Sequence, residues 1–205
     1  MPMSTGTTVR SRRAERKRAT RETEVVVTLE LDGTGEVSAD TGLPFFDHML
    51  AQLGRHGGLN LEVRARGDLE VDAHHTVEDT GIVLGEALAE ALGPKEGVRR
   101  FASIAVPLDE ALVEVSLDLS GRPYLHYDVE LAEAAPLGTP GFDAQLAEEF
   151  WRAFANGAAV CLHIELRHGR NSHHVLEASF KAVGRALRDA ARVEGSAIPS
   201  TKGQL

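Results

Sequence analysis

Apolar and polar residues along the chain follow strand-like and helix-like spacings that divide it into two similar halves. The first half predicts a strand over 24–31, a turn over 32–35, a returning strand from 36–38, a helix from 43 through 53, a strand over 59–65 and a helix that begins at the His-His pair and ends at 93–94. The second half predicts a hairpin over 101–107 and 111–119, a helix over 145–155, a strand over 159–166 and a helix running to about 192. Residues 132–141, rich in Ala, Pro and Gly, read as an irregular connector.

This order predicts an α+β fold made of two duplicated half-domains, each a small sheet with helices on one face. Such a unit buries one sheet face under its helices, and two units can pack helix layer on helix layer. The predicted division is a flexible basic tail over 1–20, a first half over 21–97, a second half over 98–194 and a C-terminal tail over 195–205.

One short motif occurs twice, at the start of the last helix of each half. Residues 74–78 read His-His-Thr-Val-Glu and residues 173–177 read His-His-Val-Leu-Glu, 99 positions later. The match continues at the same offset, because Gly85 corresponds to Gly184 and Leu88 to Leu187. A matched helical tail indicates duplication and not a chance repeat of two His pairs.

The spacing within the motif suits metal binding. Residues one turn apart share a helical face, so His74 or His75 can converge with Glu78. Adjacent residues on a helix diverge by about 100°, so the two imidazoles of one pair would serve two different ions. A single His pair is usually a surface feature, whereas two in register favour a metal site. Imidazole and carboxylate ligands suit Mn, Fe, Co, Ni or Zn, and the lack of ligating cysteines argues against a structural zinc finger.

Bulk composition narrows the class of protein. The 205 residues are 42% hydrophobic and 26% charged, as expected for one or two small globular domains. No apolar stretch reaches the length of a transmembrane helix, so no membrane association is predicted. Cys161 is the only cysteine and lies in an apolar run, which predicts a buried thiol, a reducing compartment and a cytoplasmic location.

The net charge of −9 is unevenly distributed. The first 20 residues carry six basic side chains against Glu15, whereas the remaining 185 residues hold 16 basic and 30 acidic ones. The basic leader fits either an organellar transit peptide or a disordered bacterial N-terminus, and its lack of an apolar face favours the second. The acidic remainder has few aromatic residues, which argues against nucleic-acid binding.

Five motifs in order resemble imidazoleglycerol-phosphate dehydratase, an enzyme family of histidine biosynthesis. They are Phe46–Leu50, Asp72–Asp79, Ser120–Tyr124, Asn171–His174 and Pro199–Gly203, and the resemblance covers the chain after residue 18. The resemblance implies the monofunctional enzyme, a duplicated α+β half-domain, a closed 24-mer of octahedral symmetry, and two Mn²⁺ ions per active site, with other divalent transition metals as alternatives.

The resemblance also assigns residues. It adds two histidines to the duplicated motif, giving three His and one Glu per ion; the full set is His48, His74, His75, Glu78, His163, His173, His174 and Glu177. An octahedral ion then keeps two positions for substrate. The residues implied to contact the substrate and its phosphate are Gln52, Arg100, Arg122, Lys181, Ser200 and Lys202. Glu22 is implied to reach the reacting carbons, His56 is a candidate pocket residue, and His126 and His168 are not expected to be ligands.

The implied reaction removes water from the glycerol side chain of imidazole glycerol phosphate and yields imidazole acetol phosphate. No carbonyl acidifies the departing C–H proton, so the ring must act as the electron sink. As a metal-bound imidazolate it could expel the hydroxyl and form a diazafulvene-like intermediate. A base such as Glu22 would then remove the proton. Two alternatives stay open: a dinuclear metallohydrolase such as a phosphatase, and a non-catalytic metal-binding assembly.

Overall fold

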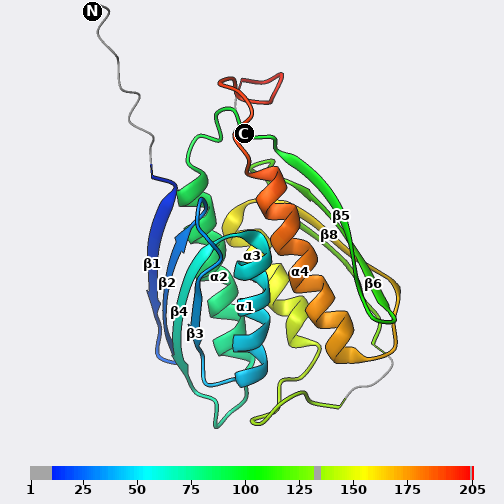
Figure 1. Ribbon diagram of the computed structural model, residues 1–205. Coiled ribbons are helices and arrows are strands. Elements are labelled where there is room, and N and C mark those ends of the chain that lie inside the picture. The colour runs from blue at the N-terminus through cyan, green and yellow to red at the C-terminus, as the bar shows by residue number, and fades with distance from the viewer. Residues whose placement is uncertain (1–10, 132–134, 204) are drawn as a thin grey trace, which may run out of the picture.

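Two four-stranded sheets enclose a layer of four helices in the computed structural model, which describes residues 11–131, 135–203 and 205 (Figure 1). The strand orders are β1-β2-β4-β3 and β5-β6-β8-β7. The first half contains β1 (Arg13–Ala19), β2 (Thr23–Glu30), β3 (Val37–Asp40), α1 (Pro44–Gly57), β4 (Asn60–Gly67) and α2 (His74–Leu92). The second contains β5 (Phe101–Leu108), β6 (Ala111–Asp118), β7 (Tyr124–Asp128), α3 (Leu146–Ala158), β8 (Cys161–His168) and α4 (Ser172–Ala190).

The two halves have the same topology, which confirms the predicted α+β fold with duplicated halves. Each begins with an antiparallel hairpin, β1–β2 or β5–β6. A strand, a crossover helix and a parallel strand follow, β3–α1–β4 or β7–α3–β8. A final helix, α2 or α4, then packs against the hairpin. Helices of opposite halves contact each other, α2 with α3 and α1 with α4, so helix layer packs on helix layer.

The first strand corrects the prediction for the N-terminal tail. Residues 13–19 were expected to be flexible, but they form β1, which pairs with β2 along its whole length. Its basic side chains meet acidic partners: Arg16 pairs with Glu90 and Arg18 with Asp79. Both faces of β1 carry charged side chains, since Arg16 and Arg18 face α2 while Glu15 and Lys17 lie on the opposite face. The strand therefore has no apolar alternation, and the hydrophobic pattern did not predict it. The rest of that tail, residues 1–10, lies outside the described residues.

Two further corrections concern strand pairing. Residues 36–38 were expected to return along β2, yet β3 lies parallel to β4, with Val37 opposite Leu61. The crossover through the 14-residue helix α1 permits this parallel pairing, whereas a short turn does not. Strand β7 was not predicted, because its exposed residues Tyr124, His126 and Asp128 alternate with only half-buried ones at the sheet edge.

The core lies between the inward faces of the sheets and the helix layer. Val25, Val27 and Leu29 alternate inward on β2, and Val113 and Val115 do so on β6. Aromatic rings fill the space between the helices, where the Phe150 and Phe180 centroids are 5.4 Å apart and those of Trp151 and Phe180 are 4.5 Å apart. Across the described part of the chain, no helix combines the length and apolarity that a membrane span requires.

The matched glycines of the repeat lie where helices of opposite halves cross. A Cβ on Gly85 would lie 2.5 Å from the backbone oxygen of Phe154 on α3, and a Cβ on Gly184 would lie 2.4 Å from that of Leu53 on α1. Backbone atoms cannot rotate away as a side chain can, so these crossings require glycine. The matched glycines that follow the two His-His motifs thus permit the close helix contacts that join the halves.

We expect Gly184→Ala to lower the free energy of unfolding by about 1–3 kcal/mol, because the added methyl group would force α1 and α4 apart. The helix-propensity gain of about 1 kcal/mol for replacing glycine opposes this loss only in part. Urea denaturation of the variant and wild type measures the difference. Gly195→Ala is the matched control, since a Cβ there has no atom within 4 Å; equal stability of both variants would contradict the crowding.

Candidate metal and substrate site

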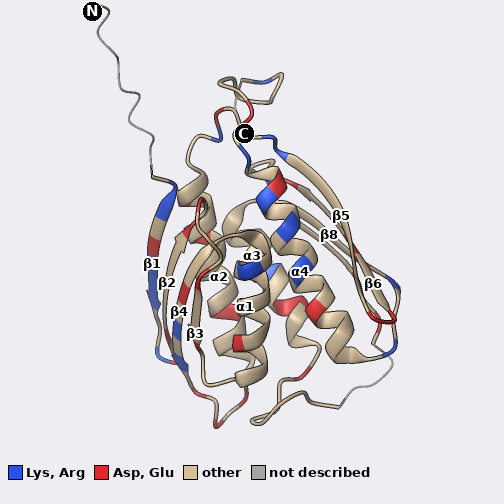
Figure 2. Ribbon diagram, viewed as in Figure 1, with Lys and Arg blue, Asp and Glu red and all other residues tan. Residues whose placement is uncertain are grey.

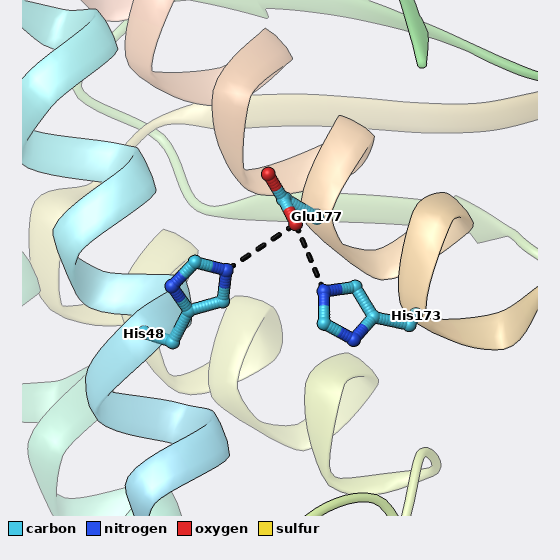
Figure 3. A group of neighbouring side chains, drawn as sticks. All are labelled: His48, His173 and Glu177. Atoms are coloured by element: carbon cyan, nitrogen blue, oxygen red, sulfur yellow. Dashed lines mark hydrogen bonds and ion pairs between the residues drawn. The ribbon is translucent and has the colours of Figure 1, made fainter. Parts of the chain in front are cut away.

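Two histidines and a glutamate from helices α1 and α4 converge on one point (Figure 3). Glu177 Oε2 lies 2.9 Å from His173 Nε2 and 3.3 Å from His48 Nε2. The three ligand atoms all lie within 4.8 Å of one another, and no other group of three or more His, Cys, Asp or Glu among the described residues meets this criterion. The i, i+4 spacing on α4 brings His173 to Glu177, and the packing of α1 on α4 adds His48.

The carboxylate of Glu177 is ionised in this setting. Burial alone would raise its pKa, but hydrogen bonds from Lys181, His48 and His173 outweigh burial and hold the pKa of Glu177 at about 2. Lys181 Nζ is 2.6 Å from the second carboxylate oxygen, Oε1. Gln52 Nε2 lies 3.4 Å from His48 Nδ1, on the side of the ring away from Glu177. The predicted substrate residues Gln52 and Lys181 therefore lie beside this cluster.

The second histidine of each pair faces a different carboxylate. His75 Nδ1 lies 3.1 Å from Asp68 Oδ2, and His174 Nδ1 lies 2.8 Å from Glu110 Oε2. These hydrogen bonds raise the pKa values of both histidines, and the bond from His174 helps hold the pKa of Glu110 at about 2. A carboxylate on Nδ1 leaves Nε2 free to bind a metal and fixes the ring, as around many metal-binding histidines.

Asp68 and Glu110 were not predicted from the sequence. Asp68 lies in the loop before α2, seven residues from His75, whereas Glu110 lies in the β5–β6 turn, 64 residues from His174. The imidazoles within each pair diverge as expected: their planes are inclined by 88° for His74 and His75, and by 82° for His173 and His174. His74 instead approaches Glu78, with Nε2 and Oε2 3.8 Å apart.

Glu22 lies in the β1–β2 turn, next to the start of α2. Its Oε2 is 3.9 Å from His75 Nε2. Asp79 on α2 holds this turn, because its carboxylate accepts hydrogen bonds from Arg18 and Thr23 at the ends of β1 and β2. The predicted catalytic carboxylate and a predicted metal ligand are therefore neighbours, although 53 positions separate them in the sequence.

His163 lies apart from the other predicted ligands. It sits on β8 between Leu162 and Ile164, which face the helices and are fully buried, so its ring lies on the outward face of the sheet. There it contacts Tyr124, with ring centroids 5.5 Å apart, and Cys161, with Sγ 3.5 Å from Nε2. Cys161 was expected in the core, but residues of a strand alternate between faces and this thiol is only half-buried.

Four predicted substrate residues line one cavity of about 460 Å³ at the C-terminal tail. They are Arg100, Arg122, Ser200 and Lys202. The guanidinium of Arg100 already has protein partners. Its Nε donates a hydrogen bond to Asp118 at 2.7 Å, and its Nη1 donates one to the Pro199 carbonyl at 2.8 Å. Of the three cations that line this cavity, Lys202 and Arg122 form no ion pair with a described residue and can meet an anion.

We expect Lys202→Ala to weaken substrate binding by about 1.5–3 kcal/mol, because it removes a charge-assisted hydrogen bond to phosphate. Metal content should not change, because Lys202 is not among the predicted metal ligands and a protonated ammonium group offers no lone pair to a metal. Steady-state kinetics with metal analysis on the same samples tests both statements. Unchanged kinetics would mean that the tail does not bind phosphate.

The C-terminal tail, which lines the cavity, and the first turns of α4, which carry His173 and Glu177, lie at opposite ends of that helix (Figure 1). Arg100 N donates to the carbonyl of Ala190, the last residue of α4, whereas His173 and His174 occupy its first turn. Seventeen residues at 1.5 Å each separate these ends by about 25 Å. One small substrate cannot span that distance, so one chain alone does not bring the predicted site together.

Comparison with known proteins shows to which family the chain belongs. Residues 41–187 match the family model of imidazoleglycerol-phosphate dehydratase. The chain belongs to the imidazoleglycerol-phosphate dehydratase family. The matched span includes both His-His motifs, His48 and His163, so the family match and the site geometry concern the same residues.

Relatives match nearly the whole chain. The imidazoleglycerol-phosphate dehydratase of Acidothermus cellulolyticus is 57% identical over 95% of this chain and 93% of its own length, and that of Methanopyrus kandleri is 52% identical over 95% and 96%. Two crystal structures are similar, each at 38% identity. The Staphylococcus aureus dehydratase has a TM-score of 0.77 and covers 87% of this chain and 97% of its own. That of Pyrococcus furiosus, in complex with (S)-C348, has a TM-score of 0.80 and covers 93% and 100%.

Proposed function

We propose that this chain dehydrates imidazole glycerol phosphate to imidazole acetol phosphate, a step of histidine biosynthesis. Family membership supports the reaction class, and the observation that carries the proposal is the His48–His173–Glu177 cluster, which α1 and the His-His helix α4 form together. A non-catalytic metal-binding protein would not need Arg122, Ser200 and Lys202 gathered around one cavity.

The donor atoms fit two Mn²⁺ ions or similar divalent metals. The predicted ligands are imidazole nitrogens and carboxylate oxygens without thiolates, the set that borderline and hard ions prefer. His48, His173 and Glu177 would hold an ion together, and Asp68 and Glu110 orient His75 and His174 for the same purpose. When bound, such ions would supply Lewis-acid chemistry that favours the deprotonated imidazole of the substrate, whose electrons can help to expel the hydroxyl.

The protein side chains would perform the remaining steps. Glu22 is placed beside His75 and would remove the proton from the carbon chain as the hydroxyl leaves. Lys202 and Arg122 would bind the phosphate and fix the side chain relative to Glu22. The enol that results from loss of water would rearrange to the ketone without further help from the protein.

We propose further that copies of the chain share each site, in the 24-mer that the family resemblance implies. The support is geometric: the tail cavity and outward-facing His163 lie at one end of the chain, and the first turn of α4 lies at the other. A closed assembly can place the tail of one copy against the His-His motif of another.

The direct test is to incubate the chain with imidazole glycerol phosphate and Mn²⁺ and to follow formation of the keto product. Free phosphate is measured in the same samples. Keto product with retained phosphate is the expected result. Release of phosphate without the ketone would show the alternative, a dinuclear metallohydrolase, and overturn the proposal.

We also expect active protein to hold two divalent ions per chain, because the ligands come from two duplicated helices. Elemental analysis of protein that has been loaded with Mn²⁺, desalted and assayed measures this ratio. A ratio of one ion per chain in fully active protein would contradict the dinuclear site.

A further inference from the structure

A second concentration of positive charge lies on α1 and α4, beyond the metal-type cluster. A cavity of about 460 Å³ is lined by Arg55 and His56 at the end of α1, by Arg185 and Arg188 on α4, and by Arg192 just after α4. Figure 2 shows the blue bands of the two helices on the same side of the molecule. Asp189 is the single acidic residue in the lining. This concentration stands out in a chain whose net charge is −9.

Three of these guanidinium groups have no carboxylate partner. Within the described ranges, Arg55, Arg185 and Arg188 form no ion pair, and Arg192 only approaches Glu194 at 3.7 Å. Most other described arginines are paired, including Arg12, Arg16, Arg18, Arg64, Arg66, Arg100, Arg152 and Arg167. Holding like charges together without a counter-ion is unfavourable, so the cavity suits an anionic ligand.

The neighbouring histidine reports the same positive potential. Burial and then the charges of Lys181 and Arg185 lower the pKa of His56, which favours the neutral form of its ring. A neutral imidazole can donate a hydrogen bond to an anion without adding charge. The guanidinium groups supply paired donors that match phosphate oxygens.

A larger cavity of about 780 Å³ adjoins this one and shares Arg188 and Arg192 with it. Its lining includes Leu31, Leu59 and Leu92 from the first half and Leu187 from the second. Arg12, Asp32 and Glu96 also line this cavity, so it is mixed in character. Its leucine wall and the adjoining arginines suit a ligand with an apolar body and an anionic head.

We propose that these adjoining cavities form an accessory site for a phosphate monoester with an apolar body, distinct from the tail cavity of the proposed function. The phosphate lies among Arg55, Arg185 and Arg188, and the body lies against Leu59, Leu92 and Leu187. The site spans α1, α4 and both halves, so its occupant bridges the same helices that carry His48 and Glu177.

Calorimetry with phenyl phosphate tests the proposal on the full, Mn²⁺-loaded chain carrying Arg122→Gln and Lys202→Ala, which removes the free cations of the tail cavity. We expect one retained binding event, which adding Arg185→Gln and Arg188→Gln weakens about tenfold or more. Arg55→Gln, on the other helix, should weaken it as well. Arg13→Gln removes the same charge from the exposed face of β1 and should leave binding unchanged.

Inorganic phosphate should bind more weakly than phenyl phosphate, because it cannot use the apolar cavity. Absence of the retained event, or equal binding in the Arg185→Gln/Arg188→Gln and Arg13→Gln proteins, would overturn the site. Equal affinity for the two probes would overturn the apolar part. Sedimentation is measured in parallel; loss of assembly in Arg185→Gln/Arg188→Gln protein would assign the arginines to a contact between copies and also overturn the proposal.

Discussion

Replacing Glu177 by glutamine should abolish turnover while the chain stays folded. Glutamine has the same size but no charge, and Glu177 is the group that His48, His173 and Lys181 all contact. Loss of residues that only orient a metal ligand costs tenfold to a hundredfold, so loss of a ligand itself should reduce kcat on the order of a thousandfold or more. Bound metal should decrease in the same samples.

Glu86→Gln is the matched control, because Glu86 is an exposed carboxylate on α2 and its replacement changes the net charge equally. Far-UV circular dichroism and the urea midpoint show whether each variant is folded. Wild-type kcat together with full metal content in Glu177→Gln would exclude Glu177 as a ligand. A variant that keeps its metal but loses activity would instead place Glu177 against the substrate.

The helical and central-strand parts of the fold could be predicted from the sequence because their buried faces are continuous. Strands β2, β4, β6 and β8 alternate apolar and polar residues, and the helices repeat apolar residues at helical spacing. Strands β1 and β7 could not be predicted, since β1 carries charge and β7 is an edge strand with an exposed face. The pairing of β3 was predicted wrongly for a different reason. The predicted hairpin over residues 31–38 paired strands that are neighbours in sequence, whereas α1 takes the chain across to β4, the parallel partner of β3.

The candidate site, too, could be predicted only in part from the sequence. Local helical spacing is enough to predict the meeting of His173 and Glu177, and the divergence of His173 from His174. The carboxylates that orient His75 and His174 come from other loops, so only tertiary structure reveals Asp68 and Glu110. The separation of the tail cavity from the first turn of α4 also follows from the fold alone.

That separation leads to the last prediction: two inactive variants should restore activity when they assemble together. His163→Ala removes a predicted ligand at the tail end, and Glu177→Gln removes one on α4. In a shared site, a His163→Ala copy still supplies Glu177, and a Glu177→Gln copy still supplies His163. Random co-assembly of equal amounts should therefore complete about one quarter of the sites, and activity should return to about that fraction of wild type.

The experiment requires that copies mix, so the variants are dissociated together, reassembled with Mn²⁺ and assayed after sedimentation confirms one particle size. Each variant treated alone is the control and should stay inactive. A mixture that stays inactive would mean that one chain supplies both residues to the same site. That outcome would require His163 to leave the outward face of β8, where Leu162 and Ile164 now anchor the strand against the helices. The alternation of side chains along a strand makes such a movement costly, since it would turn both buried residues toward solvent.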